Sequence, residues 1–239
     1  MLRKTFKATA LSLIPALAGL AFALKPMSVT LDTNGYGAAK TFRLDNESSN
    51  QVAFQVSMVS REMDIDGQET LEPVTNLFTL FPPQGVIAPG QSQSIRLIWR
   101  GPAKLTEEQA FRIVAEELPV AFAPAEQGHA QIRLLLRYRG TVYVRPRSAK
   151  PDLVAESLTK TATNLWQLTI TNRGNAHHNL AGPSLTLTAP TGQKIGVSTN
   201  YLDSINGENI LPHHTRNFLI ALPPEVEAQA YHVRLDENE

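Results

Sequence analysis

The chain has 239 residues, of which 42% are hydrophobic and 18% charged, so it is long enough for one large globular domain or two of about 100 residues each. Lysine and arginine together equal the acids, at 22 each, which argues against nucleic acid as a partner. The sequence contains no cysteine, and this excludes disulfides, thiol nucleophiles and cysteine-based zinc sites.

The first 23 residues have the three-part pattern of a secretory signal peptide. Residues 1–7 carry three cations and no acid, residues 8–20 are apolar, and residues 21–23 (Ala-Phe-Ala) match a signal-peptidase site. A membrane span needs about 20 apolar residues, whereas this run is shorter and contains Pro15. We expect a mature chain that begins at Leu24 and carries 19 cations and 22 acids, a net charge of −3.

After the signal segment, apolar and polar residues alternate in short runs, which predicts half-buried β-strands. Turn residues separate the runs, as at residues 88–90 and 101–102. Only residues 105–110 indicate a helical turn, because Thr106 and Gln109 have capping-box spacing. The predicted strands are residues 41–44, 51–58, 94–99, 111–115, 131–138 and 141–144. This density of strands is typical of an immunoglobulin-like sandwich.

Residues 145–152 contain two prolines and few apolar side chains, as expected of a hinge between domains. Strand-like runs then resume at residues 153–155, 165–171, 184–187, 217–220 and 231–235. The sequence therefore predicts an all-β protein with a second, smaller sandwich after the first.

The run at residues 131–139, Gln-Ile-Arg-Leu-Leu-Leu-Arg-Tyr-Arg, is unusually regular. Its large apolar residues Ile132, Leu134, Leu136 and Tyr138 share one face of a strand, because side chains alternate between the two faces. That face either fills the core of this protein or binds a partner, and the pattern alone leaves both readings open.

No enzyme motif is present: the chain lacks a nucleophile elbow, a phosphate loop and a metalloprotease helix motif. The pairs His177-His178 and His213-His214 do not indicate a metal site, because adjacent side chains on a strand point apart and no acid completes a ligand spacing. We expect neither catalysis nor a cofactor.

Four local patterns, at residues 81–99, 107–120, 142–146 and 166–180, occur in an order and spacing that cover nearly the whole mature chain. In these patterns the chain resembles the periplasmic pilus-assembly chaperones of the chaperone-usher pathway, in a divergent, archaic-type branch. The resemblance implies two immunoglobulin-like β-sandwich domains, residues 24–146 and 147–239, in an L-shape with a cleft between them. It also implies a periplasmic location, with pilin or fimbrial subunits and an outer-membrane usher as partners. Nucleic acid and membrane insertion of the mature chain are not expected, and self-association of the free protein stays open.

The resemblance gives the regular strand a role. In that family, the corresponding strand is donated to a pilin subunit that lacks its own last strand, and Ile132, Leu134, Leu136 and Tyr138 would fill the groove of the subunit. Backbone hydrogen bonds provide attachment in this mode and the spaced side chains provide register. Burying three large aliphatic side chains would contribute about 5 to 9 kcal/mol, at roughly 1.5 to 3 kcal/mol each.

Two features of the family pattern concern charged groups. Better-known members anchor the terminal carboxylate of the subunit with an arginine and a lysine, but Ser28 and Thr141 occupy those positions here. Lys25, Arg137 and Arg139 are the nearest cationic substitutes. A second feature is an ionic cluster that orients the two domains; the residues carried over are Arg96, Glu108 and Arg145, with Glu225, Glu227 or Asp236 as the acid from the second domain.

Two other classes of function compete with a chaperone. A structural or adhesive fimbrial component should carry an alternating donor segment near its N-terminus, and residues 24–39 hold only a short alternation before two glycines. A generic secreted binding protein would have no reason to reproduce the order of the four patterns. Both comparisons favour the chaperone.

Overall fold

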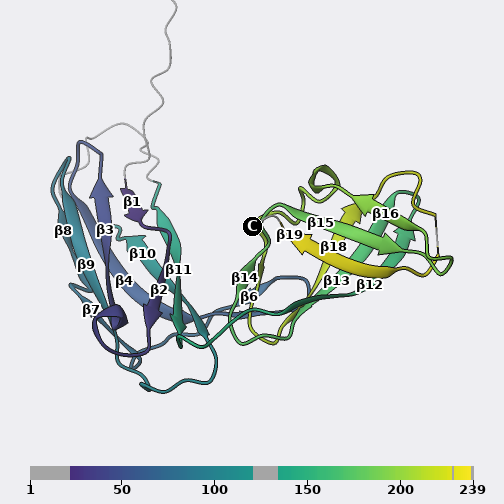
Figure 1. The fold of residues 1–239 in the computed structure, drawn as a ribbon. Helices are drawn as coiled ribbons and strands as arrows, with labels where there is room; N and C mark the ends of the chain where they lie inside the picture. The colour runs from purple at the N-terminus through teal and green to yellow at the C-terminus, as the bar shows by residue number, and fades with distance from the viewer. Residues whose placement is uncertain (1–21, 121–133, 228, 238–239) are drawn as a thin grey trace, which may run out of the picture.

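The structure, a computed structural model, describes residues 22–120, 134–227 and 229–237. These residues form two β-sandwich domains set at an angle to each other (Figure 1). The described residues contain no α-helix and only two 3₁₀ turns, Tyr36–Ala38 and Thr199–Tyr201. The prediction of an all-β chain with two immunoglobulin-like sandwiches is confirmed.

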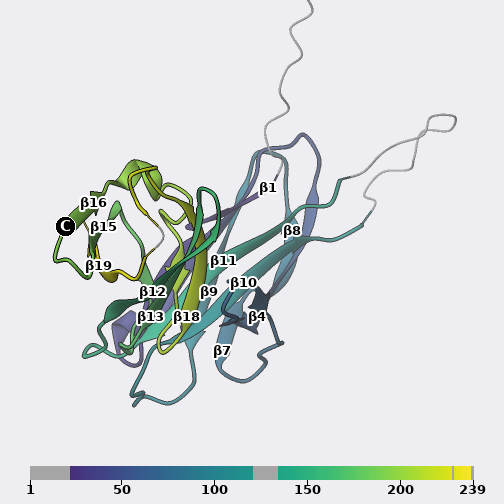
Figure 2. The ribbon, with the colours of Figure 1, turned by 90° about the vertical axis from the view of Figure 1, so that its right-hand side faces the viewer.

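The first domain packs a four-stranded sheet against a five-stranded one. The four-stranded sheet has the order β1 (Phe22–Lys25), β3 (Ala39–Asn46), β9 (Ser92–Trp99) and β7 (Phe78–Phe81). The five-stranded sheet has the order β2 (Ser28–Asp32), β11 (Arg137–Arg145), β10 (Gln109–Glu117), β4 (Val52–Ser60) and β8 (Gln84–Ile87). All pairings are antiparallel except that of β11 with β2, and β10 lies between β4 and β11 (Figure 2).

Period-two alternation explains why these strands form a sandwich. On β9, Ile95, Leu97 and Trp99 point inward and are almost completely buried, while the intervening Arg96 is exposed. Each large apolar side chain that is fully buried contributes about 1.5 to 3 kcal/mol. The same alternation on the facing sheet closes one continuous apolar core between the two layers.

The second domain has its own core between two three-stranded sheets. One sheet has the order β12 (Leu153–Ala162), β13 (Leu165–Asn172) and β18 (Thr215–Ala221). The other has the order β16 (Lys194–Val197), β15 (Pro183–Thr188) and β19 (His232–Glu237). A two-residue pair, β14 (His178–Asn179) with β17 (Asn209–Ile210), lies at the end that faces the first domain (Figure 1).

A small hairpin of the first domain extends toward the second. Its strands are β5 (Glu62–Met63) and β6 (Glu69–Thr70). Met63 of this hairpin, Tyr143 of β11 and Leu211 of the second domain form a separate buried apolar cluster. The domains therefore meet through a small apolar contact that polar groups surround.

One local prediction differs from the structure, and the predicted cleavage site falls within a strand. The helical turn at residues 105–110 is wrong, because β10 begins at Gln109 and the segment before it bonds to the second domain: the Glu108 N–H donates to the Asn175 carbonyl at 2.9 Å. The strand β1 begins at Phe22, two residues before the predicted mature end. Phe22 has no exposed surface and lies in the core of the first domain, with its ring centroid 6.0 Å from that of Tyr138.

Candidate binding edge and domain interface

The strand β11 is paired along only part of its length. Its residues Thr141 to Arg145 lie between β10 and β2, and residues 137–140 pair with β10 alone. Among the described strands, none runs along the other side of residues 137–140. An unpaired edge presents backbone N–H and C=O groups that can accept another strand.

The side chains at this edge are divided between the protein core and solvent. Leu134 is 80% exposed and the neighbouring Leu135 is 45% exposed. Leu136 and Tyr138 are half-buried and pack against the core of the first domain. Ile132, the fourth residue of the predicted face, lies outside the described residues. Of the three described, Leu134 is the one that the protein's own core does not use.

The three cations predicted to hold a carboxylate are not gathered in one place. Lys25 Nζ lies 3.0 Å from Asp45 Oδ2, and Arg137 pairs with Glu116 on the neighbouring strand β10. Burial of Asp45 acts to raise the pKa of that carboxyl, but hydrogen bonds from Lys25 and Arg43 lower it overall. Arg139 is exposed and makes no ion pair within the described ranges. Of these three cations, Arg139 is the one without an ion-pair partner among the described residues.

Ser28 and Thr141, the positions of the missing cations, are direct partners in the parallel pairing of β2 with β11. Arg112 on β10 stands opposite Thr141 and donates to its hydroxyl. The same guanidinium grips Glu69 of the hairpin with two N–H groups, including Nε to Oε2 at 3.1 Å. A cation therefore does reach the middle of β11, but it comes from the neighbouring strand and already holds a carboxylate.

Glu69 is bound by a second arginine. Arg61 Nε lies 2.6 Å from Glu69 Oε1, and Arg61 Nη1 also donates to the Tyr143 hydroxyl at 3.0 Å and to Asn209 Oδ1 at 3.3 Å. Partial burial acts to raise the pKa of Glu69, but Arg112 and Arg61 lower it below its ordinary value. The carboxylate is thus held ionised between two guanidinium groups.

A second polar cluster joins the domains where β11 ends. The Glu108 carboxylate is fully buried, accepts from the backbone N–H of His177 at 3.0 Å, and contacts the His177 ring and Arg145. Burial acts to raise the pKa of Glu108, but His177 and Arg145 lower it overall. The His177 ring also stacks on Tyr143, with centroids 3.4 Å apart and planes 10° apart. Glu108 and Arg145 of the predicted cluster do come together, with a histidine of the second domain.

The remaining parts of the predicted cluster are corrected by the structure. Arg96 is exposed on β9, which belongs to the four-stranded sheet, whereas Glu108 and Arg145 flank strands of the five-stranded sheet. Asp236 bonds instead to Arg234, with Nε to Oδ1 at 2.9 Å, and no ion pair within the described ranges joins Glu225 or Glu227 to the cluster. In place of the expected acid, the second domain contributes His177 to the cluster.

Sequence reasoning missed His177, Arg61, Glu69 and Arg112. The two-residue strands of the hairpin are too short to show a period, although Asp64-Ile65-Asp66-Gly67 carries the turn signal of an Asp-Gly pair. His213 and His214 also bridge the domains, with Nε2 atoms 3.2 Å from Glu107 and 3.8 Å from Glu62, respectively. Within the described ranges, no group of three or more His, Asp or Glu side chains could hold a metal ion.

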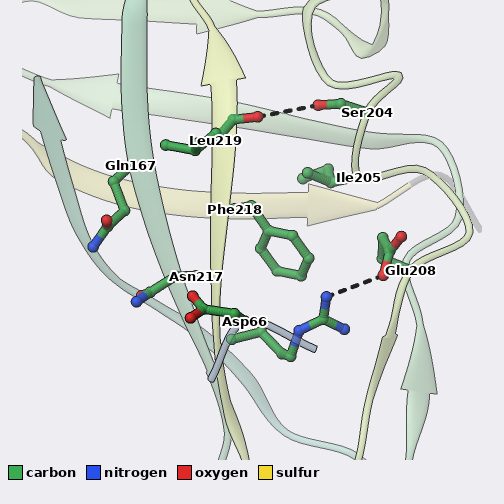
Figure 3. A pocket seen from close by; sticks show the side chains of 9 residues that line it. Asp66, Gln167, Ser204, Ile205, Glu208, Asn217, Phe218 and Leu219 are labelled. Carbon is green, nitrogen blue, oxygen red and sulfur yellow. Dashed lines mark hydrogen bonds and ion pairs between the residues drawn. The ribbon is translucent and has the colours of Figure 1, made fainter. Parts of the chain in front are cut away.

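A cavity of about 370 Å³ opens between the hairpin and the second domain. Asp66 forms one wall, and the other walls come from the second domain, as Figure 3 shows. They are formed by Gln167, Ser204, Ile205, Glu208, Arg216, Asn217, Phe218 and Leu219. The Arg216 guanidinium pairs with Glu208 at 3.1 Å and lies 4.8 Å from the centre of the Phe218 ring. Arg216 is thus paired with one of the two acids that line the cavity.

Comparison with known proteins identifies the chain. The family model described as pili and flagellar-assembly chaperone, PapD N-terminal domain, matches residues 23–150. The chain belongs to this chaperone family. No curated protein matches the chain, and the part of the chaperone that the structure describes has no helix long and apolar enough to span a bilayer.

Solved structures extend the likeness over both domains of the chaperone. The class 5 fimbriae chaperone CfaA is 17% identical, with 91% of this chain and 100% of that chain covered and a TM-score of 0.57. The E. coli chaperone DraB is 17% identical over 91% and 95%, with a TM-score of 0.55. A chain from the complex of the Salmonella enterica SafA pilin with the SafB chaperone is 16% identical over 97% and 99%, with a TM-score of 0.54. These likenesses show a shared two-domain fold.

Proposed function

We propose that this chaperone acts in the periplasm, where it donates the free edge of β11 to an incomplete pilus or fimbrial subunit and delivers the subunit to an outer-membrane usher. The observation that carries the proposal is the unpaired edge at residues 137–140, with Leu134 80% exposed beside it. An extended partner that pairs there gains backbone hydrogen bonds, and its groove can receive the exposed leucine. One of the similar solved structures is a complex of a pilin with a chaperone, which supports a subunit as the partner.

The contacts within the protein suggest which residues serve the partner. Leu136 and Tyr138 are half-buried against the protein's own core, so they are partly shared between the chaperone and a bound subunit. Leu134 has no such internal role. A subunit therefore gains most from Leu134, and we assign Ile132, two positions earlier on the same face of the pattern, to the same groove.

Arg139 is the cation that we propose to contact an anionic group of the subunit. It alternates with Gly140 and so shares the outer face of β11 with Thr141. Lys25 and Arg137 already have the acid partners Asp45 and Glu116. The proposed activity needs no catalytic group and no cofactor.

The test is Leu134→Glu, with Leu219→Glu as the matched control. Leu219 lies on β18 of the second domain and is also exposed, at 56%. A carboxylate forced into an apolar groove should weaken subunit binding roughly 100-fold or more, and both variants should keep the β-sheet circular dichroism of the wild type. The measurement is co-purification of a subunit from the periplasm, followed by titration with that subunit.

Two results would count against the proposal. If Leu134→Glu binds the subunit as well as Leu219→Glu does, the edge of β11 is not the binding site. If the wild type carries no pilin-like partner in stoichiometric amount, subunit binding itself is wrong. A free protein that sediments as a dimer, and a Leu134→Glu variant that sediments as a monomer, would instead assign the edge to a second copy.

A further inference from the structure

The hairpin formed by residues 62–70, which we call the domain hairpin, is a preorganised element. Its turn is braced by Asp64, whose carboxylate accepts from the backbone N–H groups of Asp66 at 3.0 Å and Gln68 at 2.8 Å. The Gly67 N–H donates to the Asp64 carbonyl at 3.0 Å, and Gly67 has φ of 83°, a conformation that favours glycine. The tip therefore holds its shape without help from the second domain.

The tip contacts the second domain in two ways. The Asn217 N–H on β18 donates to the Ile65 carbonyl at 2.7 Å, which joins the backbones of the two domains. Gly67 lies flat against Arg216, and a Cβ atom at position 67 would overlap the Arg216 guanidinium. That guanidinium also donates to Met63 Sδ at 3.3 Å. Glycine is thus favoured at position 67 for two reasons, its positive φ and its close approach to Arg216.

The base of the hairpin is tied to the first domain by charge. Glu69 is bound by Arg61, which lies between β4 and β5, and by Arg112 of β10. Arg112 in turn donates to Thr141 in the middle of β11. A continuous chain of polar contacts therefore leads from β11 through Arg112, Glu69 and Arg61 to Asn209 of the second domain.

Apart from Met63, which is buried against Tyr143 and Leu211, the hairpin buries little apolar surface. Ile65 at its tip is 47% exposed, and Asp66 borders the cavity of about 370 Å³. The contact depends on a few hydrogen bonds and ion pairs, each of which contributes little net stability alone. Such a contact can be released without disturbing either core.

We propose that the domain hairpin is a polar latch that fixes the angle between the two domains. The cluster of Glu108, Arg145 and His177, with the neighbouring pair of His213 and Glu107, joins the domains where β11 ends, and attachment at that one place would leave them freer to rotate about it. The hairpin adds a second attachment, through Asn217 and Arg216. Two separate attachments restrict rotation, so Glu69 sets the width of the space between the domains beside β11.

The experiment measures the distance between the domains in the free protein, so its result does not depend on subunit binding. Because the chain has no cysteine, Lys40→Cys and Lys194→Cys provide two unique spin-label sites, both exposed and one in each domain. Pulsed electron paramagnetic resonance then gives the distribution of label distances. The variants are Glu69→Gln and, as the matched control, Glu72→Gln, whose parent carboxylate is exposed and makes no ion pair among the described residues.

The parent protein and Glu72→Gln should give one narrow distribution. Glu69→Gln should give a broader distribution with a shifted mean, because it removes the charge that holds both arginines.

Gly67→Ala tests the latch from its other end, since the added methyl group would displace Arg216. Gly67→Ala should broaden the distribution as Glu69→Gln does. If Glu69→Gln loses its β-sheet circular dichroism, the test of the latch rests on Gly67→Ala. The proposal would be overturned if both variants fold and give a narrow, unshifted distribution of label distances. If Glu69→Gln does not fold, the same result in Gly67→Ala would overturn it. The angle would then be set by the other contacts between the domains, which include the Glu108 cluster.

Discussion

The two halves of β11 differ in what surrounds them. Residues 141–145 lie between β10 and β2, with Val142 and Val144 fully buried and Arg145 bound to Glu108. Residues 137–140 have one partner strand, and the chain before them exposes Leu134. One strand thus contributes to the core at one end and offers an edge at the other. The paired half can hold the free half in place for a partner, because both belong to a single continuous strand.

The largest expected effect on stability comes from a glutamate in the paired half of β11, compared with a glutamate at position 134, just before the free half. Val142→Glu would bury an unpaired carboxylate in the core of the first domain and should destabilise it by at least about 4 kcal/mol. Leu134→Glu, at an exposed position, should leave the urea midpoint of unfolding close to that of the wild type. Similar midpoints for the two variants would show that the halves of β11 do not differ in this way.

The substitution Phe22→Ala tests how the core packs against Tyr138 in the free half of β11. The Phe22 ring packs beside Tyr138 and has no exposed surface, so Phe22→Ala should cost about 3 to 5 kcal/mol of unfolding free energy. Chemical denaturation followed by tryptophan fluorescence measures this loss. A loss below about 1 kcal/mol would mean that the site collapses readily and that Phe22 is not a core residue in solution.

The burial of Phe22 also affects where we expect signal peptidase to cut the chain. Cleavage after Ala23 would remove Phe22 from the mature protein, and β1 would lose the residue that packs against Tyr138. We therefore expect signal peptidase to cut before Phe22; the Ala16-Leu17-Ala18 sequence offers a small-x-small pattern upstream. The intact mass of the periplasmic protein decides between the two positions. A mass that corresponds to a start at Leu24 would restore the boundary predicted from the sequence.

Acid should weaken the attachment at the paired end of β11. The folded-state pKa of Glu108 lies below its ordinary value of 4.5, so its contribution to stability is complete above that value and is lost as the pH falls through the folded-state pKa. Glu108→Gln should cost on the order of 1 to 3 kcal/mol at neutral pH and should flatten the dependence of stability on pH below 4.5. Thermal unfolding between neutral and acid pH measures both. An equally steep acid dependence in the variant would assign it to other carboxyls.

The sequence predicted the parts of the molecule that follow from local periodicity. Ile95, Leu97 and Trp99 repeat every second residue, and the structure buries all three. The assignment of Arg96 failed because local order does not reveal which sheet a strand joins. His177 was missed because its role depends on how the two domains meet. The hairpin around Gly67 has strands of two residues, which is too few for any period to appear.

The smallest expected effect concerns Arg139, at the boundary between the two halves. Its guanidinium is exposed, and charges at the rim of an interface contribute only about 0 to 1 kcal/mol. Arg139→Ala should therefore weaken subunit binding only a few-fold, mainly through a slower association rate at low salt. Lys40→Ala, an exposed cation on β3 of the other sheet, is the matched control and should leave the rate unchanged. Stopped-flow association at two salt concentrations separates the variants. If Arg139→Ala instead reduced affinity by orders of magnitude at every salt concentration, Arg139 would lie inside the bound interface as a desolvated ion pair, and the free half of β11 would recognise charge as strongly as apolar shape.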